Sequence, residues 1–154
     1  MGLFDKLKNA VTGGAAKVHI DVGVVTRGEP FQQTVRAQAE HADVKYDRVY
    51  LKVEGVEEAE VPDSDIVRDS DGDTRRRREI ARAKCTTFEL ESNVAPGGEL
   101  QAHQTGEWTV QVEIPSTANP EFSGRYARHY YQVFAGMDCF GNDPDSGWVR
   151  LSVK

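Results

Sequence analysis

The sequence contains few cysteines, no long apolar run and no N-terminal apolar segment of secretory length. Its two cysteines, Cys85 and Cys139, lie far apart and lack the close spacing of a zinc or redox motif. We therefore expect reduced, buried thiols rather than a disulfide scaffold or a metal site. No stretch reaches the roughly 18 apolar residues of a membrane-spanning helix. Together these absences predict a cytoplasmic protein.

Positive charge is also scarce relative to negative charge. The formal net charge is -6 at pH 7, and the pI is about 5.2. A protein that binds nucleic acid by releasing counterions from phosphates needs the opposite balance, so we expect no nucleic-acid partner. Adhesion of the whole surface to an anionic membrane is disfavoured for the same reason.

The remaining composition is that of a folded globular domain. The chain has 154 residues, of which 38% are hydrophobic and 29% charged. A chain of this length buries a hydrophobic core without help from disulfides or metals. We therefore expect one globular domain and predict no cofactor.

The N-terminus has an amphipathic pattern. The apolar residues that recur there at spacings of three and four are Leu3, Phe4, Leu7 and Val11. This spacing predicts a short helix over residues 1–14, which Gly13 and Gly14 end. A helix this short is marginal alone in water, so its apolar side must dock on another surface. We expect it to pack on its own domain, with a membrane or a partner as the alternative.

From residue 15 onward the hydrophobic period changes to two, which is typical of β-strands with one buried face. The segments with this pattern are 18–24, 31–40, 44–54, 80–90, 108–114, 125–139 and 149–153. Because no helical crossovers are available to join parallel strands, residues 15–154 are predicted to form an all-β antiparallel sandwich.

Three finer features follow from the same pattern. The apolar positions switch parity between Cys85 and Phe88, which predicts a β-bulge. Residues 94–99 contain Pro-Gly-Gly and predict a turn. Both faces of residues 125–139 are partly apolar, so this segment is expected to be a central strand.

Residues 55–79 interrupt the strand pattern with dense charge, acidic first and basic afterwards. With Pro62 and Gly72 among them, these residues predict a solvated loop. Carboxylates and guanidinium groups bind charged partners, so the loop is also a candidate contact surface. Its candidate partner-binding residues are Asp69, Asp71, Asp73, Arg75, Arg76, Arg77 and Arg78.

The tip of this segment resembles a calcium-binding loop at first sight. In an EF-hand the glycine stands at position six, with oxygen ligands at positions one, three, five and twelve. If Gly72 is at position six, Val67 falls at position one and Arg78 at position twelve. The motif therefore fails, and a weak adventitious divalent site is the remaining alternative.

Residues that carry catalytic chemistry are scattered. The four histidines are His19, His41, His103 and His129, in different segments and without metal-ligand spacing. Ser123 and Ser146 do not lie in a Gly-x-Ser-x-Gly motif. We therefore predict no enzyme and no catalytic residue, and keep a hydrolase with a spatially assembled site as an alternative.

Six segments together resemble one known family, namely 2–7, 13–18, 27–29, 108–115, 126–138 and 141–148. They are similar to the bacterial sporulation-control proteins, which are arrestin-like. The resemblance implies a short N-terminal helix followed by a single immunoglobulin-like sandwich of the arrestin type. It also implies a non-catalytic adaptor or regulator.

Members of that family usually contain two sandwiches in tandem, and this sequence resembles the first of them. An uncovered sheet edge or face would accept a second copy, so a homodimer is one hypothesis. The preferred hypothesis is a protein-binding adaptor that uses its sheet edges or residues 55–79. A self-assembling structural protein, as a dimer or filament, is the alternative.

Overall fold

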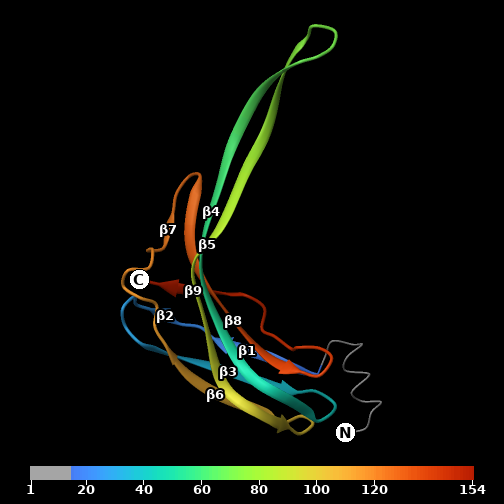
Figure 1. Ribbon diagram of the computed structural model, residues 1–154, viewed down its shortest axis with the longest axis vertical. Coiled ribbons are helices and arrows are strands. Elements are labelled where there is room, and N and C mark those ends of the chain that lie inside the picture. The colour runs from blue at the N-terminus through green and yellow to red at the C-terminus, as the bar shows by residue number, and fades with distance from the viewer. Residues whose placement is uncertain (1–14) are drawn as a thin grey trace.

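The computed structural model describes residues 15–154, and all regular secondary structure in this range is β-strand (Figure 1). The strands are β1 (Ala16–Asp21), β2 (Val24–Val25), β3 (Phe31–Ala39), β4 (Val44–Arg68), β5 (Thr74–Leu100), β6 (Thr105–Val112), β7 (Phe122–Ser123), β8 (Ala127–Cys139) and β9 (Val149–Val153). The all-β prediction is confirmed. The predicted helix with Leu3, Phe4, Leu7 and Val11 lies outside the described residues.

The strands form two sheets that share one core. A three-stranded antiparallel sheet has the order β1-β3-β6. A six-stranded sheet has the order β2-β9-β8-β4-β5, with β7 paired to β8 and with β2 and β9 parallel. Residues 18–24 were predicted as one strand, but the chain changes sheets there: Val18 is buried, whereas Val22 and Val24 are exposed.

The core lies between the two sheets, where alternate residues of each strand point inward. β3 supplies Val35 and β4 supplies Leu51, both with 0% exposure. β8 supplies Tyr131, Val133, Ala135 and Met137. Full burial of a leucine contributes about 1.5–3 kcal/mol to stability. β8 lies between β9 and β4, so the prediction of a central strand is confirmed.

The chain crosses between the sheets over residues 113–121, and polar contacts fix this crossing. The Tyr131 hydroxyl donates to the Asn119 carbonyl at 2.6 Å. The Arg27 guanidinium donates to the Ala118 carbonyl at 2.7 Å. These partly buried hydrogen bonds tie the crossing to β8 and to the turn between β2 and β3.

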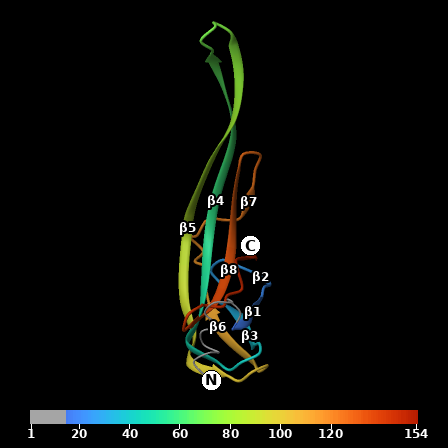
Figure 2. The same cartoon turned by 90° about the vertical axis from the view of Figure 1, so that its right-hand side faces the viewer.

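Residues 55–79 are not a solvated loop, and that prediction is wrong. β4 continues to Arg68 and β5 begins at Thr74, so the two strands form a long hairpin that projects far from the sandwich (Figures 1 and 2). The acidic half of the segment folds back antiparallel to the basic half. Glu60 lies opposite Arg82, and Asp65 lies opposite Arg77. In sequence order these charged residues are typical of a solvated loop. In the hairpin, residues of opposite charge lie across from each other, which favours the pairing of the two strands.

The predicted bulge is present, and the predicted turn is wrong. Gly55 and Val56 are consecutive on β4 but pair with Phe88 and Thr86, which leaves Thr87 as the extra residue. Residues 94–99 lie inside β5. A Cβ atom on Gly98 would lie 2.6 Å from the Tyr46 hydroxyl oxygen, so glycine here permits close approach between strands rather than a turn.

Candidate functional site

The hairpin beyond the sandwich is the most exposed structure in the described chain. The pairing of β4 with β8 ends at Ala59 and Ala127, and the Glu60 amide donates a last hydrogen bond to the Tyr126 carbonyl. Beyond this point β4 and β5 pair only with each other in the described chain. We call residues 61–81 the arm; each of them is exposed. The arm therefore offers two faces and two free strand edges to a partner.

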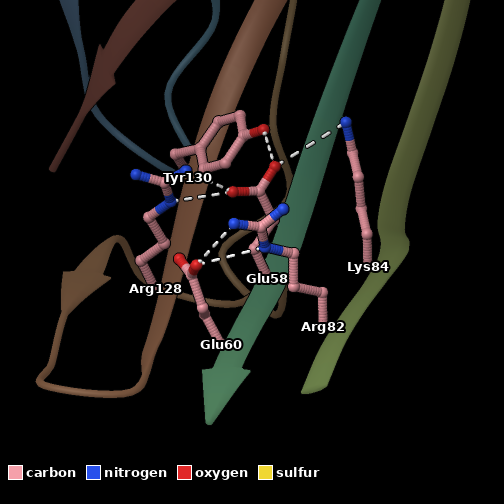
Figure 3. Close-up of polar contacts among 6 residues, drawn as sticks. All are labelled: Glu58, Glu60, Arg82, Lys84, Arg128 and Tyr130. Carbon is pink, nitrogen blue, oxygen red and sulfur yellow. Dashed lines mark hydrogen bonds and ion pairs between the residues drawn. The ribbon is translucent and has the colours of Figure 1, made fainter. Parts of the chain in front are cut away.

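A cluster of charged side chains lies at the root of the arm, on the outer face of the six-stranded sheet (Figure 3). Glu58 is its centre. Its carboxylate accepts hydrogen bonds from the Tyr130 hydroxyl at 2.6 Å and from Arg128 Nε at 2.8 Å. Lys84 Nζ lies 3.7 Å from the same carboxylate. Glu58 thus ties β4 to β5 on one side and to β8 on the other.

A second pair extends the cluster toward the arm. Arg82 donates from Nε and Nη2 to Glu60 Oε1 at 3.1 and 3.0 Å. On the far side, the Arg150 guanidinium carbon lies 3.5 Å from the centre of the Tyr130 ring, in a cation–π contact. We call Glu58, Glu60, Arg82, Lys84, Arg128 and Tyr130 the root cluster.

The contacts of the root cluster shift the ionisation of its members. The Tyr130 hydroxyl and then the Arg128 guanidinium lower the pKa of Glu58, because both bind its charged form. Partial burial, followed by the Glu58 carboxylate, raises the pKa of the Tyr130 hydroxyl. The cluster is therefore a set of charges that stabilise one another at neutral pH.

An open hollow of about 590 Å³ adjoins the root cluster. Residues of β4 and β5 line one side, and residues 123–128, between β7 and β8, line the other. Arg125 lies at its edge with its guanidinium carbon 5.2 Å from the Tyr126 ring centre. Arg82, Lys84 and Arg128 are already paired with glutamates, so Arg125 is the lining cation that has no carboxylate partner in residues 15–154.

The structure places the seven predicted partner-binding residues at the outer end of the arm, but not as one patch. Asp69, Asp71 and Asp73 lie at the tip, where Gly72 adopts a positive φ of 85° that closes the turn. The Asp69 carboxylate lies 3.7 Å from Arg75 Nε.

The four arginines alternate along β5. Arg75 and Arg77 therefore point to one face of the arm, and Arg76 and Arg78 point to the other. The four arginines are consecutive in the sequence, but the strand places them in two pairs on opposite faces.

The root cluster was missed by sequence reasoning, although a signal for it exists. Glu58 and Glu60 alternate with other residues, as do Arg82 and Lys84. Two such runs of opposite charge, separated by a turn sequence, indicate a hairpin with cross-strand ion pairs.

One histidine and one glutamate, His129 and Glu121, form hydrogen bonds at the end of the crossing. His129 Nδ1 donates to the Pro120 carbonyl at 3.0 Å, so Nε2 is the acceptor and the Thr87 hydroxyl donates to it at 2.6 Å. Glu121 accepts hydrogen bonds from the backbone amides of Tyr131 and Val153. Both side chains hold the crossing in place with the atoms that catalysis would need.

Clusters of metal-ligating side chains and membrane-spanning helices are absent from residues 15–154. Within this range, no group of three or more His, Cys, Asp or Glu side chains is placed to hold a metal ion. Within the same range, no helix has the length and apolar character needed to cross a bilayer.

Comparisons with known proteins relate the chain to others by fold alone. No family model matches the sequence, and no curated protein matches it. Among solved structures, the sporulation control protein Spo0M of Bacillus subtilis is similar with a TM-score of 0.60 at 18% identity. The alignment covers 92% of this chain and 50% of the Spo0M chain, so this chain spans half of that protein. The two share a fold.

Two further structures are more distant. The CARDB domain of PF1109 from Pyrococcus furiosus, in complex with di-metal ions, has a TM-score of 0.40 at 10% identity and covers 93% of this chain and 90% of its own. AvmM, which catalyses macrocyclization in alchivemycin A biosynthesis, has a TM-score of 0.46 at 9% identity and covers 90% and 89%. Likeness at this level carries no functional inference.

Proposed function

We propose that this chain is a non-catalytic regulatory module of the arrestin-like type, which acts in the cytoplasm and binds a protein partner through its arm. The fold shared with Spo0M, a sporulation control protein, supports a regulatory role. The sequence segments that resemble the sporulation-control proteins are consistent with this role. Catalysis is disfavoured because His129 and Glu121 use their polar atoms to fix the backbone.

The observation that carries the proposal is the exposure of the arm. A two-stranded hairpin is marginally stable alone in water and normally requires packing on one face. In the arm, Ile66 is 72% exposed and Ile80 is 58% exposed. Two strands and two isoleucines that extend into solvent would be packed only when the surface of another molecule covers them.

The root cluster explains how the arm is presented. Glu58 joins β4, β5 and β8 through contacts to Lys84, Arg128 and Tyr130, so the base of the arm is anchored to the sandwich. An anchored arm holds its faces in a defined direction, which lowers the entropic cost of binding. The arm is thus a preorganised contact surface on a rigid body.

Photo-crosslinking in cells of the source organism tests this proposal. A photoreactive amino acid replaces Ile66 on the arm in one variant and Glu113, an exposed residue after β6, in a matched control. We expect protein adducts from position 66 and not from position 113. Identical adducts from both positions, or none from position 66, would contradict the proposal.

A shortened chain provides a second test of the proposal. Residues 61–81 are replaced by Asn-Gly, which joins the paired residues Glu60 and Arg82 by a two-residue turn. We expect the sandwich to keep its thermal midpoint, while the shortened chain no longer captures the protein that forms adducts with position 66 of the full-length chain. Adducts that consist of the chain itself would favour the self-assembling alternative.

A further inference from the structure

We propose that one face of the arm is a docking strip for an acidic, partly apolar segment of a partner protein. This inference rests on the proposed function and specifies the chemistry of the partner. It follows from the strand register, which sorts the mixed charges of the arm onto two different faces.

The register determines which side chains share a face. Residues directly opposite each other on antiparallel strands point to the same side, and so do residues two apart. Ile66 lies opposite Arg76, Ser64 opposite Arg78, and Pro62 opposite Ile80. One face of the arm therefore carries Pro62, Ser64, Ile66, Arg68, Thr74, Arg76, Arg78 and Ile80. We call this face the docking strip.

The docking strip has cations and no acid. Arg68, Arg76 and Arg78 each lack a carboxylate within ion-pair distance in residues 15–154. The opposite face carries Val61, Asp63, Asp65, Val67, Arg75, Arg77, Glu79 and Ala81. There, Arg77 Nε lies 2.9 Å from Glu79, so part of the positive charge is already neutralised. The unpaired guanidinium groups are thus collected on the docking strip.

Apolar groups alternate with these cations. Ile66 lies beside Arg76 and Arg68, and Ile80 lies across from Pro62, nearer the sandwich. From Pro62 to Arg68 the strip is about 20 Å long, at roughly 3.4 Å per residue. The arm twists along its length, so the strip winds around it (Figure 2). A ligand that covers the strip must therefore offer carboxylates and apolar side chains in alternation.

An acidic polypeptide fits these features better than the other anionic surfaces in a cell. A phosphate backbone or an anionic bilayer would meet Asp69, Asp71 and Asp73 at the tip and a chain with net charge -6. A polypeptide segment ends before the tip and avoids that repulsion. Its carboxylates pair with the planar guanidinium forks, and its apolar side chains cover Ile66 and Ile80.

The test compares two variants with the same change in charge on opposite faces. R76E/R78E reverses the charge of two arginines on the docking strip, and R75E/R77E reverses the charge of two arginines on the other face. The probe is a fluorescein-labelled peptide in which glutamate alternates with valine, and affinity is measured by fluorescence anisotropy. We expect R76E/R78E to weaken binding about tenfold or more, since two charge-assisted pairs are lost. R75E/R77E should change the affinity less than about threefold.

Several results would overturn the inference. One is an equal loss of peptide affinity in both variants. Another is the absence of binding between the acidic peptide and the wild-type chain. A third is that a lysine–valine peptide binds the wild-type chain as tightly as the acidic peptide does. Tighter binding to phosphatidylglycerol vesicles or to duplex DNA would assign the strip to another partner class. If adducts from position 66 persist in R76E/R78E, the arm remains the contact surface and only this face assignment fails.

Discussion

The sandwich and the arm share two strands, β4 and β5, yet different forces hold the two regions. In the sandwich, β4 lies between β5 and β8, and Val49 and Leu51 are 0% exposed. In the arm, the same strand exposes Val61 by 45% and Ile66 by 72%. Burial of apolar area, which dominates protein stability, therefore stops where the pairing of β4 with β8 stops, at Ala59 and Ala127. One continuous strand thus passes from a region stabilised by its core to a region held by strand pairing and cross-strand charge.

Specific side-chain contacts mark the boundary between the sandwich and the arm. At Thr87 the β-bulge turns a side chain of β5 toward His129 on β8. On the outer face, Glu58 joins the same three strands through ion pairs. A hydrogen-bonded histidine inside and a charge cluster outside thus mark the end of the sandwich.

The largest effect is expected from a cavity in the sandwich. Leu51→Ala removes a fully buried side chain and should lower the free energy of unfolding by about 2–5 kcal/mol. Ile66→Ala, on the arm, should change it by less than about 0.5 kcal/mol. Urea denaturation of both variants measures the contrast. Similar losses in the two variants would mean that the arm belongs to the cooperative core.

An intermediate effect is expected at the boundary. His129→Phe keeps a ring in place but leaves the Thr87 hydroxyl and the Pro120 carbonyl without their partner. We expect a loss of about 1–3 kcal/mol, because two hydrogen bonds are lost and each contributes about 0.5–1.5 kcal/mol net. Thr87→Val should cost less in the His129→Phe background than in the wild type. A double-mutant cycle on urea midpoints measures this coupling, and additive losses would refute it.

The sandwich was predictable because its strands follow a rule that acts within each segment. Val35 and Ala37 alternate with polar neighbours, and burial of one face per strand requires that pattern. The bulge was also predictable, since a change of parity in the apolar positions is a local signal. The topology was harder to predict from the sequence, as the exposure of Val22 and Val24 shows. The chain changes sheets there because β2 pairs with β9, which is far away in the sequence.

The candidate site was harder to predict because its features depend on register. Arg75 and Arg76 are adjacent in sequence, yet the strand turns them to opposite faces. Composition predicts solvation for such a run, and only the pairing of Ile66 with Arg76 reveals a basic and apolar face. The ion pair between Glu58 and Arg128 joins residues far apart along the chain, so no local pattern contains it.

The smallest of these effects concerns the charge of the root cluster, and its sign follows from the lowered pKa of Glu58. Its unfolded pKa is about 4.3, and hydrogen bonds from Tyr130 and Arg128 hold the folded value below this. The resulting stabilisation is complete above the unfolded pKa and is lost as pH falls through the folded pKa. Glu58→Gln should therefore lower the urea midpoint at pH 7.

The same substitution should have less effect at acidic pH, where the wild-type carboxyl is protonated as well. The difference between Glu58→Gln and the wild type should shrink as pH falls from 7 toward about 3. Glu113→Gln, at an exposed position without an ion pair in residues 15–154, is the control and should leave the midpoint unchanged at both pH values. A constant difference for Glu58→Gln would show that packing, rather than charge, anchors the arm to the sandwich, because packing is indifferent to protonation of this carboxyl.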